Sequence, residues 1–287
     1  MGPMLAVWDF LLLIRPRILA MVLLSMAAAA WATGAYPPTI KLLVHALVGA
    51  GLLIAGAVTF NQRLEMRGDA RMRRTAGRPL PAGRLSSGVV SALGSLLTVA
   101  GLGYLAMFCG PKMLIWAAAS WATYVLIYTP LKARSTWQTP IGALAGAMPV
   151  LLGAAMVDAE WSLRAISLFA IVFFWQWPHA MAIAWLYRDE FAAADVRLTA
   201  VVDPSGRSSI VLALAGAAAI LPASALAAWS YELSPGLSAG LAVLGALYLG
   251  FTLRFARQPD ARTARALLRA SVVYLPAAML LIVLAAR

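Results

Sequence analysis

The residues best suited to chemistry lie in a short polar run between two apolar stretches. Asn61, Glu65 and Asp69 recur at steps of four residues. A helix advances about 100° per residue, so these three side chains would share one face. Amide and carboxylate oxygens are hard ligands of the kind that Mg²⁺ prefers, usually together with substrate phosphates. The spacing therefore predicts a Mg²⁺ site that would take part in catalysis by binding a diphosphate.

Basic and acidic side chains elsewhere could complete such a site. A second acidic pair, Asp189 and Glu190, follows a later apolar stretch, and Asp195 comes five residues after it. We expect this pair to supply metal ligands from the other side of the diphosphate. Basic side chains could pair with its remaining oxygens, and the candidates are Arg73, Arg74, Arg78, Lys132 and Arg188. The alternative is that these charges are solvated loop residues beside membrane helices, which is common for arginines and less so for acids.

A third candidate, His179, follows Pro178 inside an apolar stretch. An ionisable side chain within a membrane span is a functional candidate by default. His179 could ligate a metal centre, donate a proton, or form a hydrogen bond with a carbonyl group that Pro178 leaves free. The sequence alone leaves these three roles open.

The elements that must position these residues are membrane helices. Of the 287 residues, 62% are hydrophobic and only 12% are charged, about half the charged fraction of soluble domains. Apolar runs of about 20 residues recur along the whole chain, without the alternation of a membrane β-barrel. We therefore predict an all-α polytopic membrane protein with one domain, 1–287, and about nine spans. They lie roughly at 17–36, 39–60, 87–108, 112–131, 139–157, 164–187, 208–229, 236–254 and 267–285.

Charge placement predicts the orientation of these spans. With a cytoplasmic N-terminus, most of the 23 basic residues fall on the inner side, as the positive-inside rule requires. The first apolar run has no basic segment and cleavage site, so it is interpreted as a retained helix. We expect a multi-pass protein of a bacterial inner membrane, with a cytoplasm-facing cavity. The net charge of +12 reflects this topology rather than nucleic-acid binding. The single cysteine, Cys109, excludes an intrachain disulfide.

Three segments resemble a known family. The run NQRLEMRGDARMRRTAGRPLPAGRLS at 61–86 is similar to the first aspartate-rich motif of the UbiA-type intramembrane prenyltransferases. YTPLKARSTWQTPIGALAGAMPVLLG at 128–153 and FFWQWPHAMAIAWLYRDEF at 173–191 are similar to two further segments of that family. Met-x-Arg-Thr…Arg-Pro-Leu-Pro and Trp-Gln-x-Pro-His are typical of its heme-modifying branch. The resemblance runs in order over about residues 10–210.

The resemblance implies a UbiA-type bundle that transfers the farnesyl group of farnesyl diphosphate to a vinyl group of protoheme IX (heme B). Water adds in the same reaction, and the products are heme O and diphosphate. The resemblance also implies Mg²⁺ as cofactor, a farnesyl chain held in the lipid-embedded bundle, and His179 as a heme contact. The resemblance further suggests that heme A synthase associates with this protein. The chain departs from the family pattern at Tyr187, where Arg is common, and at 196–200, where two prolines are missing.

Two alternative functions use the same observations differently. An enzyme of this fold could prenylate a quinone precursor instead of heme. A transporter could use the acidic clusters as ion sites, but transporters place coupling residues near the bilayer midplane. Here almost all charge lies at one membrane face and only His179 lies deep. This distribution favours an enzyme with a cavity open to one side.

Overall fold

The computed structural model describes residues 3–286, and every regular element among them is helical. Nine segments in this part of the chain are long and apolar enough to cross a membrane, which confirms the predicted polytopic fold. The long helices are α2 (Pro16–Thr33), α3 (Ile40–Asp69), α4 (Ser87–Phe108), α5 (Gly110–Ala122), α7 (Gln138–Ala155), α8 (Leu163–Leu186), α11 (Arg207–Ser230), α12 (Pro235–Arg257) and α13 (Ala261–Ala285). The shorter elements are α1 (Pro3–Ile14), the π-helix η1 (Thr123–Tyr128), α6 (Thr129–Leu131), α9 (Arg188–Ala193) and α10 (Thr199–Val202).

Three spans extend well beyond their predicted ends, and the last of the nine begins at Ala261 instead of near residue 267. The first begins at Trp8 instead of near residue 17, because α1 and α2 follow each other across a break at Arg15. The second continues to Asp69 instead of ending near residue 60. Its last turns tolerate charge because Glu65 and Asp69 pair with basic side chains of the protein rather than facing lipid. The acidic motif is therefore carried by a membrane helix.

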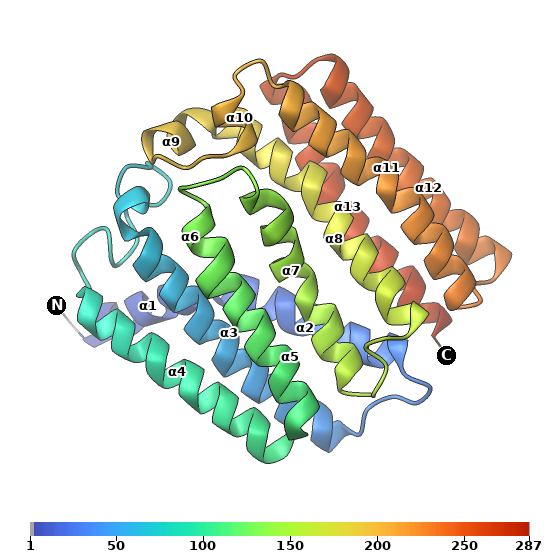
Figure 1. The fold of residues 1–287 in the computed structure, drawn as a ribbon, viewed down its shortest axis with the longest axis horizontal. Coiled ribbons are helices and arrows are strands. Elements are labelled where there is room, and N and C mark those ends of the chain that lie inside the picture. The colour runs from blue at the N-terminus through green and yellow to red at the C-terminus, as the bar shows by residue number, and fades with distance from the viewer. Residues whose placement is uncertain (1–2, 287) are drawn as a thin grey trace.

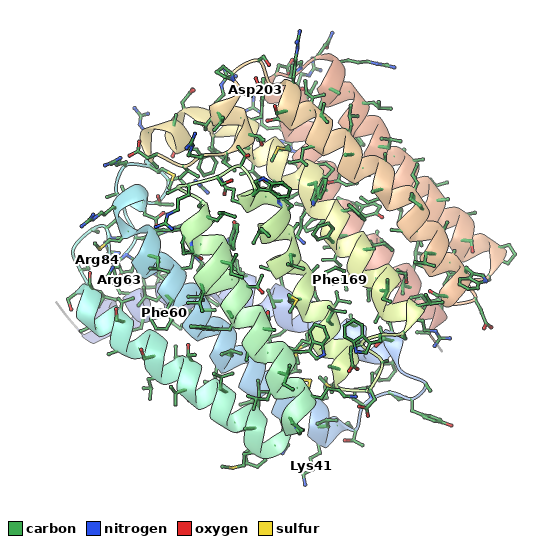
Figure 2. All side chains as sticks on the ribbon, in the orientation of Figure 1. Lys41, Phe60, Arg63, Arg84, Phe169 and Asp203 are labelled. Carbon is green, nitrogen blue, oxygen red and sulfur yellow. The ribbon has the colours of Figure 1, made fainter. Side chains whose placement is uncertain are left out.

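The helices form two groups with separate apolar cores (Figure 1). One core joins α3, α4 and α5, and the other joins α8, α11, α12 and α13, while α2 and α7 contribute to both. The loops that carry Arg84 and Asp203 lie at one end of the bundle, and Lys41 lies at the opposite end (Figure 2). The two polar loops, 70–86 and 187–206, therefore share one face of the protein.

Close packing of α2 on α7 depends on a glycine. A Cβ atom added at Gly153 would lie 2.1 Å from the main-chain oxygen of Met26, which belongs to α2 and cannot rotate away. We expect Gly153→Ala to lower the free energy of unfolding by about 1–3 kcal/mol, the usual cost of overpacking. Thermal unfolding in detergent would measure this change. Gly103→Ala is the matched control, because nothing lies within 4 Å of its added Cβ, and it should leave the melting temperature unchanged or slightly raised.

A candidate active site between the two helix groups

A cavity of about 1000 Å³ lies between the two helix groups. Its lining residues on α3 run from Ala50 to Asp69, roughly 28 Å along the helix axis. The mouth is charged, and its lining includes Arg15, Glu65, Asp69, Arg71, Arg74, Arg78, Lys132 and Asp195. The deeper walls are apolar and aromatic, with Met26, Leu53, Trp121, Leu152 and Trp175. This division suits a substrate with an anionic head and a long apolar tail.

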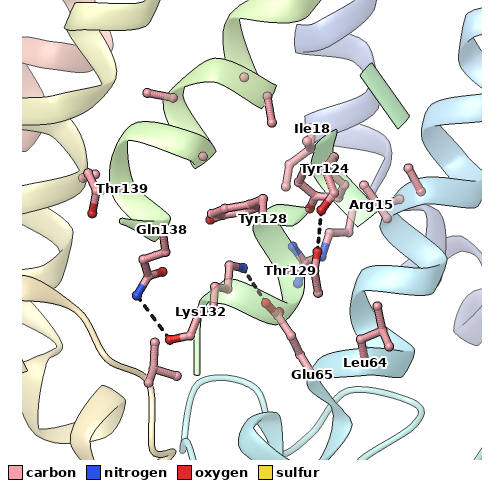
Figure 3. A pocket seen from close by; sticks show the side chains of 18 of the residues that line it. Arg15, Ile18, Leu64, Glu65, Tyr124, Tyr128, Thr129, Lys132, Gln138 and Thr139 are labelled. Carbon is pink, nitrogen blue, oxygen red and sulfur yellow. Dashed lines mark hydrogen bonds and ion pairs between the residues drawn. The ribbon is translucent and has the colours of Figure 1, made fainter. Parts of the chain in front are cut away.

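The α3 motif faces the inside of the protein. Glu65 and Asp69 line the cavity; Glu65 is paired with Lys132 (Figure 3), and Asp69 is paired with Arg78. Asn61 is fully buried one turn deeper, where its Nδ2 donates a hydrogen bond to Thr129 Oγ1 at 3.1 Å. Its Oδ1 is buried with no hydrogen-bond partner in the described part of the chain.

This donor set fits a hard divalent cation. It offers an orphaned amide oxygen and two carboxylates on successive helical turns, all of them oxygen ligands. Within residues 3–286, no three acidic, histidine or cysteine side chains gather into a complete metal cage. The protein would therefore supply only part of the coordination shell, which is usual where substrate phosphates complete it. Lys132 and Arg78, which pair with Glu65 and Asp69, also line the mouth where such phosphates would bind.

The basic side chains of the mouth are partly desolvated. Burial and the neighbouring Arg15 lower the pKa of Arg78, and its ion pair with Asp69 opposes that shift. Burial alone would lower the pKa of Lys132, but the Glu65 carboxylate outweighs it and raises this pKa. Lys132 also lies 4.6 Å from the centre of the Tyr128 ring. The mouth thus concentrates positive charge where Arg78 and Lys132 are partly shielded from water, which strengthens its attraction for an anion.

The two polar loops meet over the cavity mouth. Arg71 pairs with Asp195, and the Arg74 main-chain N–H donates to Glu190 Oε2 at 3.4 Å. The Arg74 guanidinium lies 5.2 Å from the centre of the Tyr187 ring and 5.3 Å from that of Phe191. The structure therefore places the second acidic segment next to the loop that follows the acidic motif of α3.

Members of the second acidic segment differ in position. Asp195 lines the cavity, whereas the Asp189 side chain is 98% exposed and lies 3.7 Å from Arg188. Arg188 itself stacks over the Trp185 ring at 5.0 Å, and Arg73 is exposed. Of the second acidic pair, Glu190 contacts the facing loop and Asp189 is exposed. The predicted diphosphate ligands Arg73 and Arg188 are exposed at the rim of the mouth.

Sequence reasoning missed Arg15 as a site residue. Its backbone is left-handed, with φ 48°, at the break between α1 and α2. Gln62 Nε2 donates to the Leu12 and Leu13 carbonyls at 3.3 and 2.6 Å, which satisfies groups exposed by that break. Arg15 enters the cavity beside Thr129 and has no ion-pair partner among the residues that the structure describes (Figure 3). The signal was the Arg-Pro pair before an apolar run, because Pro16 forces a helix to restart there.

The π-helix η1 shapes the opposite wall. Its residues Tyr124 and Tyr128 line the cavity, and Thr129 Oγ1 donates to the Tyr124 carbonyl at 2.8 Å. Gln138 Nε2 donates to the Lys132 carbonyl at 3.3 Å and so holds the end of this segment (Figure 3). Short π-helical turns are often found at functional sites. No single-sequence signal distinguishes this turn from an ordinary helix.

His179 lies in the deep wall of the same cavity. Its Nδ1 is 2.8 Å from Ser271 Oγ, and its ring stacks on Trp175 with 4.8 Å between ring centres. Its hydrogen bond therefore goes to a hydroxyl of α13 rather than to a carbonyl released by Pro178. One cavity joins the charged mouth to this histidine.

Comparisons with known proteins agree with this arrangement. The pattern of the UbiA prenyltransferase family matches residues 21–280. A protoheme IX farnesyltransferase of Solibacter usitatus is 36% identical over 284 residues, covering 93% of this chain and 95% of that protein. The structure of a digeranylgeranylglyceryl phosphate synthase is similar in fold, with TM-score 0.81, 15% identity and 98% of both chains covered. A UbiA homolog from Archaeoglobus fulgidus bound to GPP and Mg²⁺ has TM-score 0.62 and 14% identity, covering 96% of this chain and 99% of that one. The chain therefore belongs to the UbiA prenyltransferase family.

Proposed function

We propose that this chain transfers the farnesyl group of farnesyl diphosphate to a vinyl group of protoheme IX, with addition of water, to form heme O. The observation that carries the proposal is one cavity with a carboxylate- and arginine-lined mouth and His179 in its deep wall. The Solibacter relative, named a protoheme IX farnesyltransferase, supports the choice of substrates. The allylic C–O bond breaks, the vinyl carbon forms the new C–C bond, and water supplies the hydroxyl group and releases a proton.

The α3 oxygens are the groups that would hold Mg²⁺. Glu65 and Asp69 line the cavity, Asn61 is buried one turn deeper on the same helix, and Glu190 and Asp195 lie on the facing loop. When bound, the ion neutralises diphosphate charge and makes diphosphate a better leaving group. The Archaeoglobus homolog bound to GPP and Mg²⁺ supports a divalent cation in this fold. Asp189 would join the set only if α9 turned its exposed side chain toward the mouth.

The basic side chains stabilise the departing diphosphate. Arg15, Arg78 and Lys132 line the mouth, and the ion pairs with Asp69 and Glu65 hold Arg78 and Lys132 in place before the reaction begins. Preorganised charges in a water-poor site stabilise developing negative charge without a cost of reorganisation. Arg74 connects the two loops beside the mouth. Arg73 and Arg188 would contact the diphosphate from the rim.

The apolar chamber holds the farnesyl chain and the acceptor. Trp121, Tyr124 and Tyr128 line it next to the charged mouth, where the allylic cation would form. Aromatic faces attract cations, so these rings can shield the carbocation from early capture by water. Small residues line the chamber on α7, and Gly142 and Gly146 leave space for the side chains of Tyr128 and Gln176.

The membrane placement and the partners belong to the same proposal. We place the chain in a bacterial inner membrane with its N-terminus and the cavity mouth toward the cytoplasm, because the basic loops lie on that face. Farnesyl diphosphate would then enter from the cytoplasm and heme from the bilayer. Heme A synthase is the proposed associated protein.

The test of this function is direct. Purified full-length protein in detergent would be incubated with heme B, farnesyl diphosphate and Mg²⁺, and heme O would be detected by mass. Chelation of the metal should abolish the product and added Mg²⁺ should restore it. Prenylation of a quinone precursor in preference to heme would contradict the acceptor assignment. Uptake of substrate into liposomes without chemical change would instead support a transporter.

Adjacent acids in the second loop give a matched pair of variants. Glu190→Gln keeps an acceptor oxygen but removes its charge, which weakens the contact with the Arg74 main chain that joins the loops. The KM for farnesyl diphosphate should rise by up to roughly 10-fold, the lower end of the cost of losing a hydrogen bond to a charged group. Asp189→Asn alters an exposed side chain and should change KM less than about twofold. Steady-state kinetics would measure the KM for farnesyl diphosphate in both variants. A larger loss in Asp189→Asn would show that the loop rearranges to bring Asp189 to the metal.

A further inference from the structure

The hydroxyl group of Ser271 is the hydrogen-bond partner of His179 Nδ1. Ser271 is fully buried on α13, and its Oγ lies 2.6 Å from the Leu268 carbonyl oxygen and 2.8 Å from His179 Nδ1. A hydroxyl group has one proton to donate, and a carbonyl oxygen can only accept. Because the contact with Leu268 is the shorter of the two, we assign the Ser271 proton to it, and the Ser271 oxygen then accepts from the Nδ1–H of His179.

This arrangement leaves one free lone pair on the imidazole. In neutral histidine with a proton on Nδ1, the lone pair is on Nε2. The Nδ1 edge is covered by buried Ser271, and one ring face is covered by Trp175 at 26° between planes. His179 is only half-buried and lines the cavity, so its open part is the edge that carries Nε2. Neutral imidazole with its other nitrogen bonded to the protein is the usual form of a metal-binding histidine.

Further contacts hold the same pair of α8 side chains. Trp175 Nε1–H donates to the main-chain carbonyl of Ser271 at 2.8 Å. The Tyr248 hydroxyl donates to the Trp175 carbonyl at 3.0 Å, and its ring stacks on Tyr274 with 5.0 Å between centres. Ser271 thus anchors both His179 and the ring stacked on it, through its hydroxyl and its carbonyl.

We propose that Ser271 is a positioning residue that holds His179 as the Nδ1–H tautomer, so that Nε2 ligates the iron of the heme acceptor. This inference rests on the proposed function for the identity of the acceptor. His179 lies seven residues before α8 ends at Leu186, roughly 10 Å along the helix axis. Ligation there would hold the porphyrin in the apolar chamber beneath the diphosphate mouth. The iron would be anchored while a vinyl group at the porphyrin edge reacts.

The test measures heme coordination without turnover. Purified full-length protein would be titrated with heme B and, separately, with metal-free protoporphyrin IX, in the absence of farnesyl diphosphate. Ser271→Ala should weaken heme binding about 10-fold or more, as loss of an outer-shell partner of a ligating histidine does. It should leave protoporphyrin IX binding unchanged and alter the axial-ligand signature in absorption and electron paramagnetic resonance spectra. Ser271→Thr, which keeps the hydroxyl group, should retain the wild-type spectrum.

Two comparisons separate positioning from packing. Ser209→Ala removes another fully buried hydroxyl, one with no partner among the described residues, and should leave heme binding unchanged. His179→Ala should lose the axial signature, and adding Ser271→Ala to it should cause no further loss. Equal weakening of heme and protoporphyrin IX by Ser271→Ala, or a wild-type spectrum in His179→Ala, would overturn the inference.

The same measurements distinguish this inference from the proposed function. Heme ligation that depends on Ser271 and His179, in a protein that makes no heme O, would contradict the proposed reaction and leave the positioning role intact. Heme O formation with an unchanged heme spectrum in His179→Ala would contradict the positioning role alone.

Discussion

Replacing Asp69 by asparagine should lower kcat for heme O formation by about 100-fold or more, the scale seen when one preorganised electrostatic contact is lost. Asp69 is 2% exposed, lines the cavity and pairs with Arg78. Asparagine keeps the shape of the side chain and removes its charge. The change weakens an oxygen ligand of the proposed Mg²⁺ site and leaves Arg78 without its carboxylate, so the diphosphate loses two aligned groups at once.

A second buried aspartate provides the control for Asp69. Asp9 is also buried and also pairs with an arginine, Arg84, at 3.0 Å, but it lies outside the cavity lining. Asp9→Asn makes the same chemical change and should lower the melting temperature while kcat stays within a few-fold of wild type. Mass detection of heme O and thermal unfolding would be measured on both variants. Full activity in Asp69→Asn would exclude Asp69 from the site, and equal losses in both variants would show that the activity loss is a folding defect.

The membrane helices and the α3 side of the site could be predicted because each is determined by residues that are close together in the sequence. A run of about 20 apolar residues must cross the bilayer as a helix whatever its neighbours do. The spacing of Glu65 and Asp69 places both on one helical face by backbone geometry alone, and both line the cavity. The length of α3 was underestimated because hydropathy falls where charges begin, although those charges are paired inside the protein.

The rest of the site depends on contacts between distant segments. Asp189 and Glu190 are neighbours in sequence, and only the direction of the short helix α9 separates the exposed Asp189 from Glu190, which reaches the facing loop. The bond between His179 and Ser271 joins residues 92 positions apart, and Ser271 lies in no recognisable motif. Arg15 was visible as a basic residue before a proline, but its entry into the cavity follows from the left-handed break and from Gln62.

Lys132→Met should reduce kcat/KM for farnesyl diphosphate by about 100-fold, because Lys132 neutralises Glu65 and lines the mouth at the proposed diphosphate site. The single variant will also lower the melting temperature, since it leaves a largely buried carboxylate unpaired. Lys132→Arg keeps the charge and should retain a substantial part of the activity. Steady-state kinetics and thermal unfolding of each variant would measure the two effects separately.

The double variant Glu65→Gln/Lys132→Met distinguishes a counter-ion from a diphosphate ligand. Removing both charges should restore most of the melting temperature, because no unpaired carboxylate remains, but it should not restore activity. Recovery of both would mean that Lys132 serves only Glu65. The pH dependence gives an independent check, since Glu65 outweighs burial and raises the pKa of Lys132. Lys132 therefore stays protonated as the pH rises. Up to about pH 10, kcat/KM of the wild-type protein and of Lys132→Arg should have the same pH dependence.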